Sequence, residues 1–220
     1  MKSGLSEELI ALRVALELKD GQYVNLGIGL PTQVSNYIPK GVEVILHAEN
    51  GILGCGRIAE PAEIDPDLIN ASSQPITLNP GASICHSADA FAMIRGGHID
   101  VAVLGAYEVS EKGDLANWMI NERRVGSIGG AMDLVSGVRR VIVAMEHTSR
   151  SGKPKIVKKC RHPLTGSGVV NLIVTNLAVI EVTGGGLLLK EVAPGVTPEE
   201  VQTLTEATLI LSPDWKEMEL

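Results

Sequence analysis

The motif Glu49-Asn50-Gly51 places a carboxylate directly after an aliphatic stretch, at a point where a turn would expose it. We expect a buried strand over residues 42–46, followed by a turn sequence that starts at His47. A sharp turn at the end of a strand lifts a reactive side chain above the sheet, as in a nucleophile elbow. A carboxylate is ionised at neutral pH, so it can attack a carbonyl carbon without a general base. The residues alone leave open that Glu49 is a surface carboxylate in a loop.

His47 precedes the carboxylate by two residues, and alternation along a strand puts both side chains on the same side. We expect His47 to be a packed or hydrogen-bonded residue rather than a base.

Two glycine-rich segments are further candidates for ligand contact. Asn25-Leu26-Gly27-Ile28-Gly29 follows a short predicted strand and precedes a helix opened by Pro31. As a phosphate cradle it lacks the third glycine and the acidic ribose partner, so a tight strand-to-helix turn is the competing interpretation. Gly129-Gly130, within residues 126–133, could bring backbone N–H groups to an oxyanion, or could be an ordinary flexible loop.

Other reactive residue types are scattered. Residues 150–161 carry a basic run, which is either a solvated loop or a contact for a polyanion or partner subunit. No histidine or cysteine has a second ligand at metal-binding spacing, and we predict no metal. The three cysteines are odd in number and far apart, which fits a reducing cytoplasm better than a disulfide framework.

The remaining pattern predicts an α/β fold: a single domain with an open, mostly parallel sheet flanked by helices. Only 3% of residues are aromatic and 24 are glycine, so the core must be aliphatic and the turns tight. The leucines at 5, 9, 12 and 16 share one helix face, and Thr197 to Glu200 forms a capping box. Predicted strands span 23–26, 101–104, 141–145, 172–174 and 179–182, and a further helix spans 87–95.

Composition excludes several classes of protein. A net charge of −7 argues against nucleic acid or an anionic membrane as the main partner. No apolar run approaches the roughly 20 residues needed to span a bilayer, and the first residues do not form a signal peptide. We therefore expect a cytoplasmic protein.

Taken in order, the motifs resemble one family. They are Asn-Leu-Gly-Ile-Gly (25–29), Glu-Asn-Gly-Ile-Leu-Gly (49–54), Asp-Leu-Ile-Asn-Ala (67–71), Pro-Gly-Ala-Ser (80–83), Phe-Ala-Met-Ile-Arg-Gly-Gly-His-Ile-Asp (91–100), Gly-Asp-Leu-Ala-Asn-Trp-Met-Ile (113–120), Gly-Gly-Ala-Met-Asp-Leu-Val (129–135) and Pro-Leu-Thr-Gly (163–166). This set resembles the β subunit of bacterial 3-oxoacid CoA-transferases and the C-terminal half of the fused mitochondrial succinyl-CoA:3-ketoacid CoA-transferase. The resemblance covers residues 23 to 206 and implies one β-subunit domain over residues 1–220.

The resemblance also implies a mechanism and a set of site residues. CoA would move between carboxylic acids, one of them a 3-oxo acid or related acid, by a ping-pong reaction through a glutamyl-CoA thioester on Glu49. Coenzyme A would be a cosubstrate rather than a permanent cofactor. Gly129 and Gly130 would supply backbone donors to the oxyanion, and Asn25, Asn50 and Gly51 would help to bind CoA. An α subunit would complete the active site.

Two departures from the family pattern bear on the substrates. Ser72-Ser73-Gln74 stands where family members often carry a lysine that can meet a CoA phosphate. Residues 121–124, Asn-Glu-Arg-Arg, replace the more usual Pro-Gly-Lys near the acyl pocket, so the accepted acid need not be acetoacetate.

Two rival hypotheses are a non-catalytic acyl-CoA or sugar-phosphate binding module on the same fold and an isomerase or lyase. The intact Glu-Asn-Gly motif favours the transferase over the module, and the motifs contain no evident proton-transfer pair for an isomerase.

Overall fold

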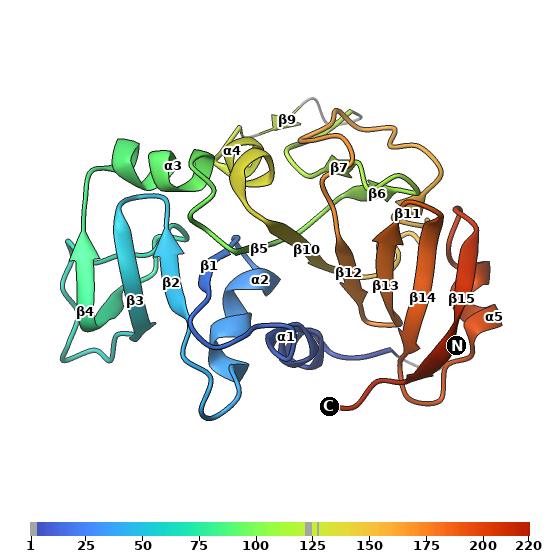
Figure 1. Cartoon of the computed structure of the whole chain (residues 1–220), viewed down its shortest axis with the longest axis horizontal. Coiled ribbons are helices and arrows are strands. Elements are labelled where there is room, and N and C mark those ends of the chain that lie inside the picture. The colour runs from blue at the N-terminus through green and yellow to red at the C-terminus, as the bar shows by residue number, and fades with distance from the viewer. Residues whose placement is uncertain (1–3, 122–124, 127) are drawn as a thin grey trace.

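A computed structural model of the chain describes residues 4–121, 125, 126 and 128–220. Within these residues the main element is a ten-stranded sheet in the order β15-β14-β13-β12-β10-β5-β1-β2-β3-β4 (Figure 1). Its strands are β1 (Tyr23–Leu26), β2 (Ile45–Ala48), β3 (Ile52–Ile58), β4 (Ile76–Ile84), β5 (Val101–Leu104), β10 (Arg140–Met145), β12 (Leu172–Thr175), β13 (Ala178–Thr183), β14 (Gly186–Val192) and β15 (Leu209–Glu217).

The centre of the sheet is parallel and its flanks are largely antiparallel. Strands β2, β1, β5, β10 and β12 run parallel to one another. On one flank β3 and β4 are antiparallel, and on the other β13 and β14 are antiparallel while β15 is parallel to β14. The predicted fold class, a mostly parallel open sheet flanked by helices, is confirmed.

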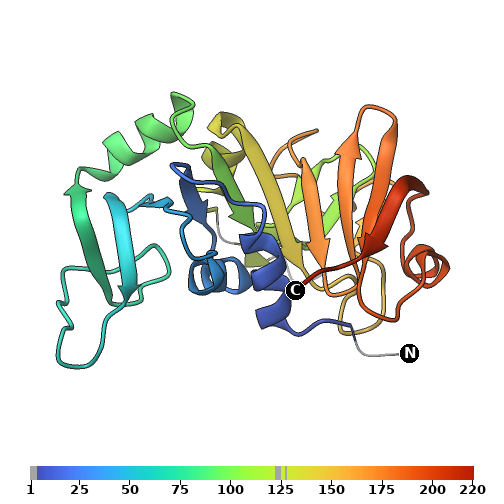
Figure 2. The same cartoon turned by 60° about the horizontal axis from the view of Figure 1, so that its bottom comes forward.

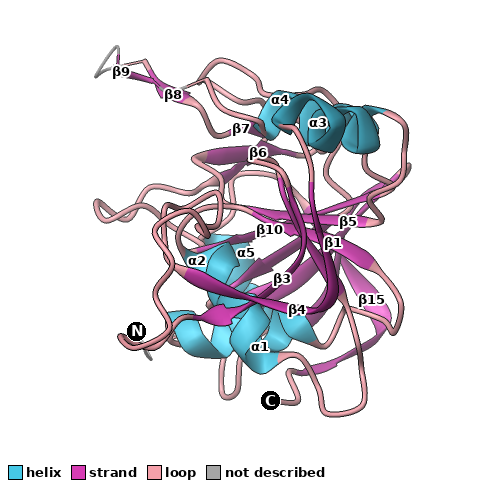
Figure 3. Ribbon diagram, turned by 90° about the vertical axis from the view of Figure 1, so that its left-hand side faces the viewer, coloured by secondary structure: helices cyan, strands magenta, loops and turns pink. Residues whose placement is uncertain are grey.

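Helices cover both faces of the sheet (Figures 2 and 3). One face carries α1 (Glu7–Ala15), α2 (Leu30–Gln33) and the 3₁₀ helix η1 (Val34–Tyr37). The other carries α3 (Ser87–Arg95) and α4 (Ala131–Gly137), and α5 (Pro198–Thr203) packs into the same core cluster as these two helices. The central strands are therefore buried on both sides, as the aliphatic composition predicts.

Strand β5 shows how the two cores are built from one run of residues. Val101 and Val103 pack with α1, whereas Ala102 and Leu104 pack with α3 and α4. Because successive side chains of a strand point to opposite faces, a continuous apolar run fills both cores.

Shorter strands lie beyond the main sheet. Strands β6 (Glu108–Ser110), β7 (Leu115–Ala116) and β11 (Ile156–Val157) form a small sheet in the order β11-β6-β7. Strands β8 (Met119–Ile120) and β9 (Val125–Gly126) form a hairpin that projects from the body (Figure 3). No helix in the described part of the chain is long and apolar enough to cross a membrane.

Two sequence predictions need correction. The strand expected at 42–46 is β2, Ile45–Ala48, so His47 lies inside the strand and not in the following turn. In α1 the buried residues include Ile10 and Val14, while Leu9 and Leu16 of the predicted leucine face are 36% and 48% exposed. The helix turns inward the face that also carries Ala11 and Ala15, whose small side chains allow close packing on the sheet.

The capping box at the start of α5 is confirmed. The Thr197 hydroxyl accepts a hydrogen bond from the backbone N–H of Glu200, and the Glu200 carboxylate accepts one from the backbone N–H of Thr197.

Candidate active site

A cavity of about 460 Å³ opens at the carboxyl ends of three neighbouring parallel strands. Open α/β sheets bind ligands at this edge, where the strands end and the loops begin. The residues that line the cavity come from the ends of β1, β2 and β5, from the β7–β8 region and from the start of α4: Gly27, Ile28, Glu49, Leu104, Gly105, Ala106, Tyr107, Asn117, Trp118, Ile128, Gly129, Gly130, Ala131, Met132 and Leu134.

Glu49 follows β2 in a tight turn to the antiparallel strand β3. The turn closes with a hydrogen bond from the Gly51 N–H to the Ala48 carbonyl at 3.0 Å. Gly51 has φ +116°, and a side chain there would collide with the carbonyl of Cys85. Only glycine therefore fits, and the predicted sharp turn after Glu49 is confirmed.

The Glu49 carboxylate is oriented by Asn25 on the adjacent strand. Asn25 and His47 are partners in the parallel register of β1 and β2, and both are almost fully buried. The amide Nδ2 of Asn25 donates to Oε2 of Glu49 at 2.9 Å and to the carbonyl of His47 at 3.2 Å. It also lies 3.1 Å from Nδ1 of the His47 ring. Three groups of the Glu49 strand and turn thus converge on one amide nitrogen.

The other carboxylate oxygen faces the glycine pair. Oε1 of Glu49 lies on the side of Gly130, where an added Cβ would come within 3.4 Å of it and within 3.2 Å of the Phe91 ring. A Cβ on Gly129 would meet nothing within 4 Å, so the backbone there borders open space. One oxygen is held by the protein and the other faces the cavity.

Two titratable side chains beside Glu49 have shifted pKa values. Burial lowers the pKa of His47, against the opposing influences of the Glu49 charge and the Ala90 backbone, so the ring is neutral at neutral pH. Burial also raises the pKa of the Cys55 thiol to about 11, with a contribution from Glu49. The thiol therefore stays protonated and does not compete as a nucleophile.

The structure brings together four of the six site residues predicted from sequence. Glu49, Gly129 and Gly130 line the cavity, and Asn25 supports Glu49. Asn50 instead lies exposed at the tip of the turn, and its Nδ2 donates to the Ile69 carbonyl at 2.7 Å. Gly51 shapes the turn and does not line the cavity.

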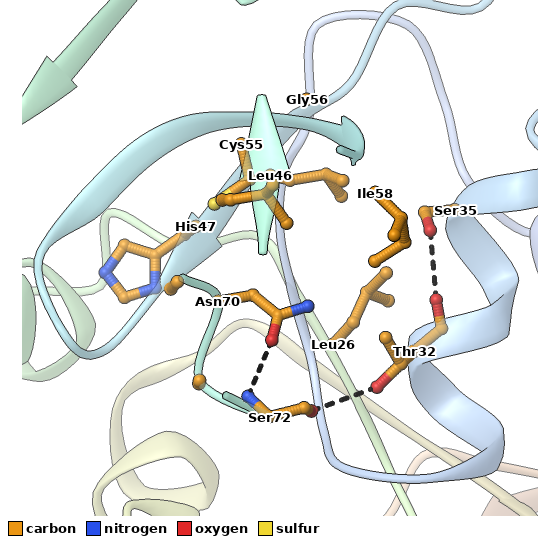
Figure 4. A pocket seen from close by; sticks show the side chains of 13 residues that line it. Leu26, Thr32, Ser35, Leu46, His47, Cys55, Gly56, Ile58, Asn70 and Ser72 are labelled. Carbon is orange, nitrogen blue, oxygen red and sulfur yellow. Dashed lines mark hydrogen bonds between the residues drawn. The ribbon is translucent and has the colours of Figure 1, made fainter. Parts of the chain in front are cut away.

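The segment that departs from the family pattern at residues 72–74 borders a second, smaller cavity (Figure 4). This cavity has a volume of about 50 Å³ and includes Thr32, His47 and Ser72 in its lining. The Ser72 hydroxyl lies 3.3 Å from that of Thr32, which donates to the Gly27 carbonyl. Ser73 adopts φ 60°, a left-handed conformation that non-glycine residues seldom take. The second departure falls mainly on residues 122–124, which lie outside the described residues.

The basic run does not line the large cavity. Lys155 is half-buried next to Glu146, and burial lowers its pKa to about 8. Arg161 forms ion pairs with Glu108 at 2.9 Å and with Glu206 at 3.3 Å. These two members of the run therefore have structural partners within the chain.

Sequence reasoning did not assign three side chains that form a wall of the cavity: Tyr107, Asn117 and Trp118. Asn117 donates to the Gly105 carbonyl and accepts from the Thr165 hydroxyl at 2.6 Å, and the Trp118 indole donates to the Leu164 carbonyl. Tyr107 follows the carboxyl end of β5, and this position could have identified it as a candidate site residue. Asn117 and Trp118 lie in the 113–120 motif that carries the family resemblance, but the motif does not indicate that they line the site, because their position depends on the small sheets.

Among the described residues no group of three or more histidine, cysteine, aspartate or glutamate side chains is arranged to hold a metal ion.

Comparison with known proteins places this geometry in a family. A sequence profile of the coenzyme A transferase family matches residues 7–204. The chain is 50% identical over 215 residues to the beta subunit of the acetate CoA-transferase of Haemophilus influenzae, covering 98% of this chain and 96% of that protein. It is 52% identical over 200 residues to one subunit of the succinyl-CoA:3-ketoacid coenzyme A transferase of Helicobacter pylori, covering 91% of this chain and 96% of that protein.

A solved structure shares the fold. The apoenzyme of an acyl-CoA transferase from Escherichia coli O157:H7 superposes with a TM-score of 0.79 at 22% sequence identity. The match covers 98% of this chain but 43% of that protein, so this chain spans less than half of its length.

Proposed function

This chain belongs to the coenzyme A transferase family and is a CoA-transferase, and we propose that it transfers CoA through a glutamyl-CoA thioester on Glu49. The observation that carries the proposal is the state of the Glu49 carboxylate. Its Oε2 is held by Asn25 at 2.9 Å, while its Oε1 faces the Gly130 side of a cavity of about 460 Å³. A nucleophile needs this arrangement: a fixed group with one free lone-pair-bearing atom directed at the substrate.

The first half of the reaction forms an anhydride. Oε1 of Glu49 attacks the carbonyl carbon of the acyl-CoA, the C–S bond breaks, and the electron pair leaves with the sulfur as CoA thiolate. The product on the enzyme is a mixed anhydride between the acyl group and Glu49.

The second half moves CoA to the enzyme. The thiolate attacks the glutamyl carbonyl carbon, the bond from that carbon to the bridging oxygen breaks, and the first acid leaves as a carboxylate. The enzyme then holds a γ-glutamyl-CoA thioester. A second carboxylate reverses both steps, so that the new acyl-CoA leaves and Glu49 is regenerated.

Each addition builds negative charge on an oxygen, and preorganised donors stabilise such charge in the transition state. In this proposal Asn25 donates to Oε2, which remains the glutamyl oxygen through the cycle, and the Gly129-Gly130 backbone is the donor for the acyl oxygen. Asn50 and Gly51 help to bind CoA indirectly, by fixing the turn and its contact with the 69–75 loop.

We further propose an α subunit as the partner that completes the site. Both relatives are named as single subunits of a transferase, and the first of them as a beta subunit. At the mouth of the cavity Ile28 and Ile128 are 72% and 71% exposed, although large apolar side chains are usually covered in a finished site. A partner seated there would cover both and exclude water from the reacting carboxylate.

The acceptor acid is proposed to be a 3-oxo acid or a related small carboxylate. The two relatives, at 50% and 52% identity, are named for acetate and for a succinyl-CoA and 3-ketoacid pair. Identity at this level therefore does not choose between the acids. The apolar part of the cavity wall, with Leu104, Trp118 and Met132, suits the carbon chain of a short acyl group.

The test is to produce the chain together with an α subunit and to incubate the complex with a panel of acyl-CoA thioesters. Intact-mass and peptide mass spectrometry should show a CoA adduct on a peptide that contains Glu49. Borohydride should convert the thioester to an alcohol, and hydroxylamine should convert it to a hydroxamate.

The matched control is Glu49→Gln, which keeps the size of the side chain and the contact with Asn25 but removes the anionic nucleophile. The adduct and the transfer activity should both disappear. A wild-type complex that forms no adduct with any acyl-CoA but binds one of them tightly would favour the non-catalytic binding module instead.

A further inference from the structure

The Glu49 site contains a buried histidine that the proposed chemistry does not use. His47 is 4% exposed and lies on β2, two residues before the nucleophile. It does not line the large cavity, so it does not touch a substrate there. Its Nδ1 lies 3.1 Å from the Asn25 amide nitrogen. Its Nε2 is buried and makes no hydrogen bond of good geometry among the described residues, although the Ala90 backbone influences the ring.

The protonation of the ring follows from its neighbours. The Asn25 nitrogen also donates to the His47 carbonyl and to Glu49, and neither of these groups can donate in return. The nitrogen, and not the oxygen, of the amide must therefore face this side. The amide has two hydrogens for three neighbours, so Nδ1 shares one N–H with the His47 carbonyl. Nδ1 is then the acceptor, and the ring proton resides on Nε2.

The orientation of Asn25 is consequently fixed from both sides. Rotating its amide by half a turn would bring Oδ1 against three acceptors, namely Glu49 Oε2, the His47 carbonyl and His47 Nδ1. In its present orientation Oδ1 is buried without a partner among the described residues, which normally costs free energy. The convergence of acceptors on Nδ2 holds the amide in place despite that cost.

We propose that His47 is a positioning residue, which acts through Asn25 to keep an N–H directed at Oε2 of Glu49 during turnover. The inference rests on the proposed function of Glu49. In that mechanism Oε2 changes from a carboxylate oxygen to an anhydride carbonyl and then to a thioester carbonyl, and it becomes a much weaker acceptor. When its hold on Asn25 weakens, the His47 side of the amide keeps the donor aimed at the oxygen that gains charge in the next transition state.

The proposal predicts a particular kinetic signature. His47→Leu removes the acceptor and retains apolar volume, so kcat should fall about 30-fold, in the range found when a supporting hydrogen bond behind an active-site group is removed. The KM for each substrate should change less than about twofold, because the ring does not contact them. His47→Gln retains one acceptor and one donor on a side chain of similar reach, and should recover most of kcat.

The decisive experiment is a double-mutant cycle in the complex with the α subunit. In the Asn25→Ala background, His47→Leu should change kcat less than about twofold, because the residue through which it acts is gone. Thermal unfolding of each complex shows whether the variants are folded. His147→Leu is the control, because it removes another buried histidine, one that lies just after β10 of the same sheet, and should leave kcat unchanged.

Two results would overturn the proposal. If His47→Leu costs the same factor with and without Asn25, the histidine acts independently and its role is structural. If His47→Leu leaves kcat unchanged in an active complex, the histidine has no part in catalysis. A wild-type complex that transfers no CoA would overturn both the proposed function of Glu49 and this inference. That outcome differs from the two His47→Leu results, because in both of those the wild-type complex is active.

Discussion

Two buried histidines, His47 and His147, lie near the carboxyl ends of parallel strands of one sheet and have contrasting surroundings. The His147 ring is 0% exposed, and both of its nitrogens have partners: Nδ1 lies 2.9 Å from the Thr175 hydroxyl and Nε2 lies 2.8 Å from the Thr205 hydroxyl. At His47, by contrast, Nε2 and the Oδ1 of Asn25 are buried and make no hydrogen bond of good geometry among the described residues, and the Ala90 backbone is the group that influences the ring. Most buried polar atoms in proteins are paired, so each exception calls for an explanation.

The difference separates a polar cluster that stabilises the fold from one arranged for chemistry. Around His147 the hydroxyls complete a closed network with a neutral ring: one threonine hydroxyl donates to the unprotonated ring nitrogen, and the other accepts from the ring N–H. The Thr205 hydroxyl also lies 2.8 Å from the Val201 carbonyl, and the Thr175 hydroxyl also accepts from the backbone N–H of Ala178 at 3.0 Å. Around His47 three acceptors share one amide nitrogen, that of Asn25, which holds one oxygen of Glu49, while the Asn25 Oδ1 is left without a hydrogen bond among the described residues. We therefore expect substitutions around His47 to change activity and substitutions around His147 to change stability.

The largest effect is expected for Asn25→Asp. The substitution keeps the shape of the side chain but puts an acceptor, and at neutral pH a second negative charge, 2.9 Å from Glu49. The kcat/KM for CoA transfer should fall about 10³-fold, the upper range for loss of one oxyanion donor. Steady-state kinetics of the complex measure this effect. The melting temperature should fall as well, because the new charge is buried beside Glu49, so the kinetics are measured at a temperature where the variant is folded. A large drop in melting with unaltered kinetics would remove the distinction between the regions.

His147→Leu should do the reverse. Two buried threonine hydroxyls would each lose one partner while keeping another, and a hydrogen bond of this kind contributes about 0.5–1.5 kcal/mol. The free energy of unfolding, measured with denaturant, should fall by about 2 kcal/mol. Transfer activity at a temperature where the variant is folded should match the wild type, and a strong loss of kcat would contradict the assignment of His147 to stability.

The same histidine makes a prediction about pH. Burial lowers the pKa of His147 to about 4, with a contribution from the positive charge of Lys155. Between pH 6.5 and pH 4 the unfolded state binds a proton that the folded state does not, so stability must fall as the pH falls. From pH 7 to pH 5 the His147 contribution amounts to about 2 kcal/mol.

Denaturant unfolding at several pH values measures this slope. His147→Gln should lose about 2 kcal/mol of the acid-dependent part, and the matched variant His98→Gln, at an exposed position, should retain it. Equal slopes in all three proteins would show that other groups dominate the acid response.

The smallest effect is expected at the glycine pair. Gly130→Ala adds a methyl group 3.2 Å from the Phe91 ring and 3.4 Å from Oε1 of Glu49, and retains the backbone N–H. We expect kcat to fall about 10-fold, as the crowded carboxylate shifts. Gly129→Ala, whose methyl group would point into open space, should lose less. A larger loss at Gly129 than at Gly130 would show that the open side of the pair is where the acyl group binds.

Much of the fold could be predicted from sequence, because apolar runs and turn sequences indicate many strands and turns locally. Apolar runs indicated the central strands, and the Glu-Asn-Gly sequence indicated the turn that carries Glu49. Strands β4 and β15 were not predicted, and each contains a proline, Pro80 and Pro213, a residue that argues against a strand. Both are edge strands of the sheet, where a missing N–H costs little.

The contact between Asn25 and His47 could not be predicted. The start of the strand that contains His47 was predicted three residues too early, because the β-branched residues at 42 and 44 favour a strand. What fixes β2 is its pairing with β1, and register between strands 22 residues apart is a tertiary property. The sequence therefore indicated the nucleophile but not the residues that orient it.

The parallel register that matches Asn25 with His47 also has a kinetic consequence. Between the two strands lies the α2 crossover, and long loop closures of this kind form late and slowly compared with helices and hairpins. A chain that has collapsed, and has even formed the β2–β3 turn, would expose Glu49 without its donor. During refolding, transfer activity should therefore return only after most of the secondary structure has formed. The time that β1 and β2 need to pair sets this lag.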